Sequence, residues 1–387
     1  MTTSAAASRA VIAGYARTPF HFAKKGRLVG VRPDDLAATA VKGLVERTGV
    51  DPADIEDLIL GCSYPEGEQG HNMARLVVFL AGLPQSVAGT TVNRFCGSAM
   101  TAIHIAAGQI AIGAGEVFVC GGVESMTRVP DGGFNPSPNP ALRERLPQAY
   151  MKMGETAEVV AERHGVSRQA QEELSVESHR KAAKAQELGR LRDEIVPVTT
   201  PEGEVVDSDG CIRPTTSLEG LAGLKLAFRE PGQGTVTAGT SSPLTDGATA
   251  VLVCSEDYAR RKGLPILARI VSTAVAGCAP EEMGMGPVPA VKKALARAGL
   301  TVGDIDIVEI NEAFSSQAVA CLRELGMARD VINLDGGGLS IGHPLGATGA
   351  RLVGKAATLL QREGKRYALA TQCIGGGQGI ATVLETV

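Results

Sequence analysis

The chain has 387 residues, of which 44% are hydrophobic and 21% charged, and its formal net charge is −4. This length predicts two or three domains, and the balance is ordinary for a globular protein. A net charge of −4 gives the chain no overall positive potential, so we expect no nucleic-acid partner. No uninterrupted apolar run reaches the roughly 18 to 20 residues that span a bilayer, so we also expect no membrane span.

The chain begins MTTSAAASRAVIAGYARTPF, which lacks the apolar core of a secretory signal. A strand-like segment, RAVIAGYA, follows almost at once, so a mitochondrial presequence is a weak alternative. The eight cysteines include no C-x-x-C pair. In a chain of this length they indicate reduced thiols rather than a disulfide or zinc framework. We therefore expect a cytoplasmic protein.

The chain repeats itself at a spacing of 250 residues. KGLVERTGVDPADIEDLILGCSY from Lys42 matches KKALARAGLTVGDIDIVEINEAF from Lys292, with Gly49 opposite Gly299. Each copy predicts an amphipathic helix, a glycine stop, a short turn and an apolar strand. Each half then continues with a glycine-rich entry, a helix of small residues and a strand. We predict two related α/β halves about a pseudo-twofold axis, with the small-residue helices buried between sheets.

A segment of different character separates the halves, at about residues 123–243. It contains a Pro/Gly/Asn-rich loop and a polar helix that opens at Ser167. The helix has a heavily charged face, so we expect it to be solvated, together with His164 and His179. The segment is interpreted as an insertion over one face of the paired core.

Cys96, in TVNRFCGSAM, ends a strand-like segment just before a small-residue helix. The amino end of a helix lowers the pKa of a thiol, and a sharp glycine turn presents a nucleophile to a cleft. The alternative is a small buried cysteine that fills a gap.

His343 lies among glycines, within a few residues of the repeat equivalent of Cys96, with Pro344 at a first-turn position. If a twofold axis relates the halves, Cys96 and His343 project toward one point, and such a pair can form an activated sulfur nucleophile. His104, in contrast, is interpreted as a packed core residue. Asn311 ends an apolar strand where the first half has Gly61, so a polar group occurs in one half only, which favours function over a turn cap.

Cys373 precedes three glycines in QCIGGGQG. Taken alone it is either a core residue or the second thiol of a site. The glycine runs do not match a phosphate-binding fingerprint, so a dinucleotide site is not expected. Bare backbone N–H groups such as that of Gly375 can instead approach a developing oxyanion.

The chain resembles the thiolase family over nearly its whole length. The shared motifs are ARTPF, NRFCGSAM, GGVESM, TVTAG with DGA, MGMGPVPA, NEAF, GGGLSIGHPLGATGAR and QCIGGGQG. The resemblance implies a five-layer αβαβα core of two related halves with an inserted loop domain. It places the first half at residues 1–122 and 244–267, the loop domain at 123–243 and the second half at 268–387.

The resemblance also implies coenzyme A thioesters as substrates, a ping-pong mechanism and no metal or redox cofactor. Cys96 would be acylated, His343 would take its proton and later activate CoA, and Cys373 would move the proton at the α-carbon. Asn311 would hold a water for one oxyanion hole, and the N–H groups of Cys96 and Gly375 would form the other. The implied contacts to the CoA arm, the adenosine phosphates and the reacting pocket are Ser242, Arg213, Met283 and Phe314.

The sequence departs from the family pattern at three places, and one of them bears on the substrate. The loop after GGVESM lacks the histidine of short-chain biosynthetic thiolases, which favours a 3-ketoacyl-CoA thiolase of fatty acid β-oxidation. Leu226 replaces a usual proline without an evident consequence, and Pro243 replaces a common glycine beside Ser242. The alternatives are a biosynthetic acetyl-CoA acetyltransferase, a β-ketoacyl synthase and a non-catalytic thiolase-like acyl-CoA binding protein. By family habit we expect a homodimer or homotetramer.

Overall fold

A computed structural model describes residues 8–387 of the chain. Its strands are β1 Ala10–Arg17, β2 His21–Phe22, β3 Asp57–Gly61, β4 Ala88–Val92, β5 Val117–Ser125, β6 Val198–Thr199, β7 Val205–Val206, β8 Thr245–Ser255, β9 Ala268–Gly277, β10 Ile307–Ile310, β11 Tyr367–Ile374 and β12 Gln378–Glu385. Its helices are α1 Pro33–Thr48, α2 Met73–Leu80, α3 Ser98–Ala111, α4 Pro140–Arg145, α5 Met153–Arg163, α6 Arg168–Glu187, α7 Leu218–Ala222, α8 Glu256–Lys262, α9 Pro287–Ala298, α10 Ser315–Leu325, α11 Gly338–Ile341 and α12 Thr348–Glu363.

The repeat in the sequence is confirmed as a repeat of strand order. The strands follow the path β10-β11-β12-β9-β1-β8-β5-β3-β4, so each half keeps to one side of the junction between β9 and β1. That junction has two residue pairs, Val11 with Arg269 and Ile12 with Ala268. The spacing of 250 residues relates β3 to β10, α3 to α12 and β5 to β11. The parallel pairing of β3 with β4 has a remnant in the second half, a single parallel bridge from Val308 to Ile332.

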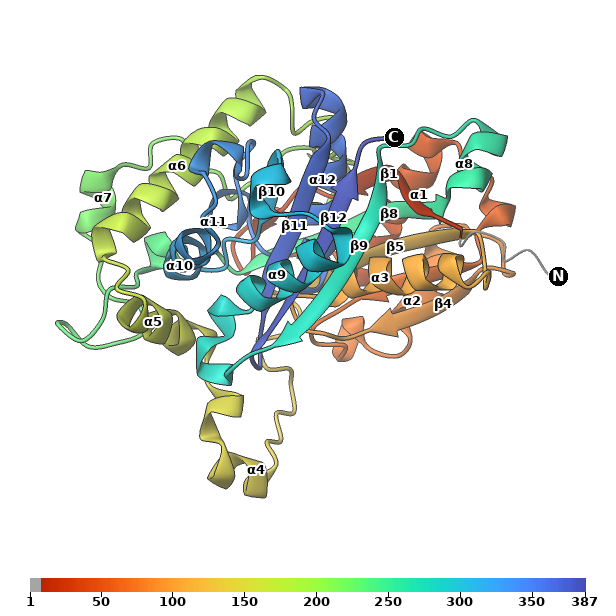
Figure 1. Cartoon of the computed structure of the whole chain (residues 1–387). Helices are drawn as coiled ribbons and strands as arrows, with labels where there is room; N and C mark the ends of the chain where they lie inside the picture. The colour runs from red at the N-terminus through yellow and green to blue at the C-terminus, as the bar shows by residue number, and fades with distance from the viewer. Residues whose placement is uncertain (1–7) are drawn as a thin grey trace.

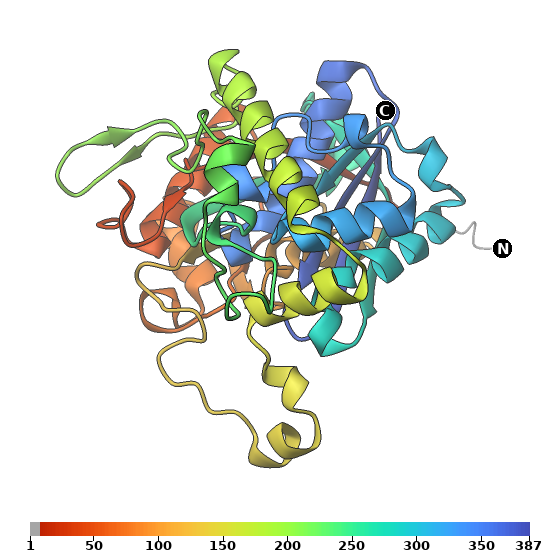
Figure 2. The ribbon, with the colours of Figure 1, turned by 90° about the vertical axis from the view of Figure 1, so that its left-hand side faces the viewer.

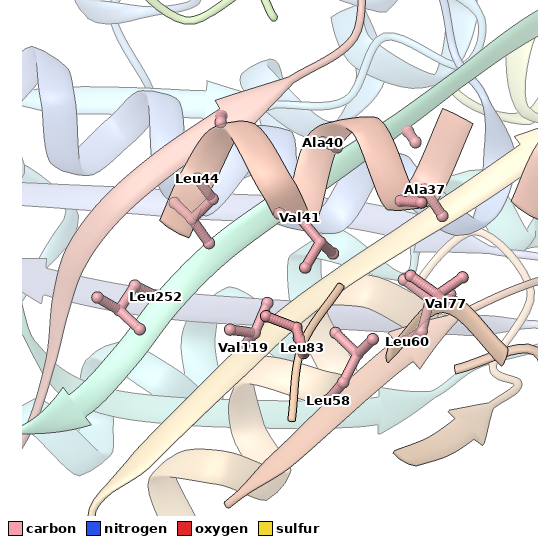
Figure 3. Close-up of a cluster of buried hydrophobic side chains, with 14 of the residues drawn as sticks. Ala37, Ala40, Val41, Leu44, Leu58, Leu60, Val77, Leu83, Val119 and Leu252 are labelled. Atoms are coloured by element: carbon pink, nitrogen blue, oxygen red, sulfur yellow. The ribbon is translucent and has the colours of Figure 1, made fainter. Parts of the chain in front are cut away.

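Three apolar cores join five layers of alternating helices and strands, and the second core covers both faces of the middle layer. This arrangement confirms the predicted fold class. The first core packs α1 and α2 on one face of β1, β3, β5 and β8, and Figure 3 shows Val41 and Leu44 of α1 over Leu58 and Val119. The second core surrounds α3 and α12, which lie between the two halves of the sheet. The third packs α9 and α10 on the outer face of the second half, where Figure 1 shows α9 across β9 and β12.

The two central helices are buried between the halves of the sheet, as predicted, and their small residues allow them to approach closely. A Cβ at Gly349 of α12 would lie 2.4 Å from the backbone nitrogen of Met100 in α3, so a larger residue would push the helices apart. The helices before the repeated strands end as predicted. Gly49 and Gly299 take left-handed conformations, with φ of 66° and 68°, which glycine adopts without cost.

The chain between β5 and β8 contains α4 to α7 and the small hairpin β6–β7. Figure 2 shows the long helix α6 lying across this side of the core, while the loop that carries α4 projects away. Ser167 caps α6 by accepting the Ala170 N–H, as predicted. The expectation of a solvated helix is wrong, because α6 packs on α10 and α11 and buries one face, including His179. Within residues 8–387, no helix is long and apolar enough to cross a membrane.

Candidate active site

Cys96 lies in a tight turn at the amino end of α3, as the sequence predicted. The N–H groups of Gly97 and Ser98 close this turn by donating to the carbonyls of Arg94 and Phe95, at 2.9 and 3.0 Å. The Ser98 hydroxyl accepts the Arg94 N–H at 2.9 Å. The Cys96 side chain remains partly exposed. The turn therefore presents a thiol at a helix end, a geometry suited to a nucleophile.

His343 lies between α11 and α12, and its side chain is almost completely buried. Its Nδ1 lies 2.7 Å from the Thr348 hydroxyl, which donates to the Pro344 carbonyl at 3.0 Å. Because a hydroxyl has one hydrogen, Thr348 accepts from Nδ1–H, and the lone pair of Nε2 is left available. Pro344 precedes a short 3₁₀ turn. It does not occupy the first turn of α12, which begins at Thr348.

Asn311 follows β10 and is fully buried. Its Nδ2 lies 3.4 Å from Nδ1 and 3.3 Å from Nε2 of His343, so the amide lies against the ring and favours neither nitrogen. Its Oδ1 has no hydrogen bond partner among residues 8–387. The Asn311 N–H donates to the Thr371 carbonyl at 3.0 Å, which places this pair beside the end of β11. An unpaired buried oxygen there suits a bound polar group or water.

Cys373 lies near the end of β11, and a glycine turn connects it to β12. Gly376 and Gly377 have φ of 80° and 83°, so this turn needs glycine. The N–H groups of Gly375 and of Cys96 itself face the Cys96 thiol and favour its thiolate. Burial, and then the nearby charge of Cys96, raises the pKa of the Cys373 thiol. The structure therefore brings both thiols, one from each half, to the same glycine turn.

The surroundings favour neutral forms of both thiols and of the imidazole. Desolvation raises the pKa of Cys96 to about 12, against the opposing effect of the two N–H groups. Burial, and then the positive charge of Arg351, lowers the pKa of His343 to about 3. The expectation that the helix end lowers the pKa of Cys96 is therefore wrong for the free protein, because desolvation outweighs the helix N–H groups.

The predicted pocket residues fall into two groups. Met283 and Phe314 lie with Cys373 in one buried apolar cluster, and the Ser242 N–H joins this region by donating to the Ala313 carbonyl at 2.9 Å. Arg213 lies apart and is exposed. Its backbone N–H and its guanidinium each lie 3.1 Å from a ring nitrogen of His179. His104 is half-buried on α3 and bonds to Thr382, so its interpretation as a packed residue is confirmed in part.

Two residues that hold the site were not singled out from the sequence. Thr348 orients His343 as described above. Glu124, at the end of β5, is buried and accepts the N–H groups of Ser63 at 2.9 Å and Gly346 at 2.8 Å. It thereby ties the first half to the loop that carries His343. The sequence could have indicated Glu124, because it is a carboxylate near the end of the apolar strand VFVCGGVES. A charge buried there requires several hydrogen bond donors.

Comparisons with known proteins match nearly the whole chain to one family. The family model described as "Thiolase, N-terminal domain" matches residues 10–257, and "Thiolase, C-terminal domain" matches residues 264–386. A protein of Pseudoalteromonas translucida named 3-ketoacyl-CoA thiolase is 48% identical over 97% of this chain and 98% of its own length. One of Bacillus subtilis with the same name is 46% identical over 97% of this chain and 99% of its own. The crystal structure of the Bacillus anthracis acetyl-CoA acetyltransferase has a TM-score of 0.91 and 39% identity, and the match covers 99% of this chain and all of that one.

Proposed function

The chain belongs to the thiolase family, and we propose that it is a 3-ketoacyl-CoA thiolase. It transfers an acyl group from a 3-oxoacyl-CoA to CoA, producing acetyl-CoA and an acyl-CoA shortened by two carbons. The observation that carries this proposal is the meeting of Cys96 and Cys373 at one glycine turn, beside Asn311, whose side chain lies against the ring of His343. The names of the full-length relatives support the same reaction.

In the first half-reaction, the Cys96 sulfur attacks the C3 carbonyl while its proton passes to Nε2 of His343. The N–H groups of Cys96 and Gly375 stabilise the oxyanion that forms. The bond between C2 and C3 then breaks, which leaves an acyl-Cys96 thioester and the enolate of acetyl-CoA. Cys373 donates its proton to C2 of this enolate and becomes a thiolate. A water held by Asn311, together with His343, stabilises the enolate oxygen before that proton arrives.

The second half-reaction begins once the imidazolium proton has moved from His343 to the Cys373 thiolate. Nε2 is then free to accept the proton of the CoA thiol, whose sulfur attacks acyl-Cys96. The departing Cys96 thiolate recovers a proton from the imidazolium, so the site returns to its starting state. The lowered pKa of His343 leaves its imidazole neutral at neutral pH, so the lone pair of Nε2 is free to accept a proton.

We assign the CoA contacts as the family resemblance implies. Ser242 contacts the pantetheine arm, Arg213 lies near the adenosine phosphates, and Met283 and Phe314 line the reacting pocket. Arg213 suits an anion because its guanidinium is exposed and forms no salt bridge within residues 8–387. The division into two halves and a loop domain at 123–243 is likewise part of this proposal.

We also propose a cytoplasmic homodimer or homotetramer. Strand β4 is the edge of the sheet and leaves one side of its backbone unpaired. Exposed apolar side chains lie nearby on α2, at Leu76, Phe79 and Leu80. An open edge beside an apolar patch favours pairing with a second copy. Light scattering of the purified protein measures the oligomeric state, and a monomer at micromolar concentration contradicts this part.

Thiolysis across 3-oxoacyl-CoA chain lengths tests the proposed substrate class. We expect kcat/KM to remain high for six or more carbons, with one acetyl-CoA formed for each substrate cleaved. A sharp optimum at acetoacetyl-CoA would instead support an acetyl-CoA acetyltransferase, the activity named for the Bacillus anthracis protein. CoA binding without turnover would support a non-catalytic acyl-CoA binding protein.

A further inference from the structure

Two glutamines flank the glycine turn that follows Cys373, and both reach across to the other half of the molecule. Gln372 lies on β11 and Gln378 begins β12. The Gln372 amide donates to the carbonyl of Cys96. The Gln378 side-chain oxygen accepts from Nη1 of Arg94 at 3.2 Å. The β11–β12 hairpin, which carries Cys373, therefore holds the segment around Cys96 by two hydrogen bonds.

The turn at Cys96 needs such support from outside. Phe95 has φ of 43°, a conformation that bulky residues rarely adopt. Within the turn, the carbonyls of Arg94 and Phe95 accept local N–H groups. The Cys96 carbonyl is held from outside by Gln372. The position of the nucleophile thus depends on a residue 276 positions away.

The turn at Cys96 also packs against β11, on the strand face that carries Gln372. A Cβ at Gly97 would lie 2.5 Å from Cδ1 of Ile374, so the peptide after Cys96 lies directly on that side chain. Gln372 and Ile374 alternate with Cys373 along the strand and project from the opposite face. The nucleophile turn therefore wraps the end of β11, with its carbonyl at Gln372 and its thiol at the Gly375 N–H.

The chemistry of Gln372 argues for a role beyond filling space. The side chain is fully buried, and its Oε1 has no hydrogen bond partner among residues 8–387. An unpaired buried amide oxygen is unfavourable, and a methionine of similar shape would avoid it. The bond to Cys96 is the contact that the amide makes and a methionine could not.

We propose that Gln372 is a positioning residue that holds the Cys96 thiol against the Gly375 N–H and beside Cys373. This proposal rests on the proposed thiolase function, in which Cys96 is the nucleophile. Without the bond, the Cys96 peptide is free to rotate and the thiol loses its aligned donor. A misplacement of about 1 Å can cost about a hundredfold in rate.

The test compares Gln372→Met with Thr382→Val. The control also removes a partly buried hydrogen bond between the halves, because Thr382 Oγ1 lies 2.8 Å from Nε2 of His104 on α3. It leaves the Cys96 turn untouched. The readouts are thiolysis, the rate at which iodoacetamide alkylates the Cys96 peptide, and the melting temperature. We expect both rates to fall about tenfold to a hundredfold in Gln372→Met and to change less than twofold in Thr382→Val. Equal rates in the two variants would overturn the proposal.

A second variant distinguishes loss of the hydrogen bond to Cys96 from a general packing defect. Gln372→Glu keeps the shape, but its carboxylate cannot donate to the Cys96 carbonyl, whereas its protonated form can. We expect its Cys96 alkylation rate, divided by that of wild type, to rise as the pH falls. A ratio that stays flat with pH contradicts the proposal. If the wild type lacks thiolysis while the alkylation differences remain, the proposed function fails and the role of Gln372 stands.

Discussion

Replacing Thr348 by valine tests how the imidazole is oriented. The Thr348 hydroxyl is fully buried and lies 2.7 Å from Nδ1 of His343. Valine has nearly the same shape, so it removes the acceptor without opening a cavity. The Nδ1–H of a buried imidazole then has no partner, and its loss matters most when His343 carries the proton of Cys96. A hydrogen bond to a charged group contributes about 1.5–3 kcal/mol.

Since 1.4 kcal/mol corresponds to a factor of ten, Thr348→Val should slow acylation of Cys96 by about tenfold to 150-fold. Rapid mixing with a 3-oxoacyl-CoA in the absence of CoA measures this step as a single burst of acetyl-CoA. The matched control is Thr249→Val, whose hydroxyl donates to the Ala347 carbonyl at 2.8 Å and does not contact His343. An acylation rate in Thr348→Val within twofold of this control would refute the assigned role of the hydroxyl.

Three further outcomes follow from the charges. Because the pKa of Cys96 is raised to about 12, its alkylation rate should rise about tenfold per pH unit from pH 7 to 10, and a plateau below pH 8.5 contradicts this. Arg213→Ala should raise KM for CoA about threefold to tenfold with kcat unchanged. The exposed Arg180, next in the chain to His179, is the control, and Arg180→Ala should change neither constant. Equal effects of the two variants on KM would contradict the phosphate assignment. Lys355→Met removes a cation buried between two carboxylates and should lower the free energy of unfolding in urea by about 3–5 kcal/mol. The control Lys292→Met, at an exposed lysine, should change that free energy by less than about 1 kcal/mol. Similar urea midpoints for the two variants would contradict the value expected for Lys355→Met.

The sequence predicted the parts of the fold that depend on local pattern and on repetition. The spacing of 250 residues placed α1 opposite α9 and β3 opposite β10, and the glycines that end these helices identified their boundaries. Small residues in α3 and α12 correctly predicted that these helices are buried between the halves of the sheet. Each of these signals lies within a short segment or within the match between two segments.

Properties that depend on distant partners were not predictable in this way. His179 lies on a charged helix, and only the packing of α6 on α10 and α11 shows that it is buried. The helix end at Cys96 predicted a lower pKa, but burial of the thiol in the folded chain raises the pKa instead. The roles of Thr348 and Gln372 likewise depend on side chains whose partners no periodicity connects.

The most direct test of the central claim is to map the acyl group after the Cys373→Ser variant reacts with acetyl-CoA. We expect a peptide that contains Cys96 to gain one acetyl group, while the variant neither condenses acetyl-CoA nor cleaves acetoacetyl-CoA. That result separates the two thiols into a nucleophile and a proton carrier. An acetyl group on another residue, or none on Cys96 in a folded protein that binds CoA, would contradict the account.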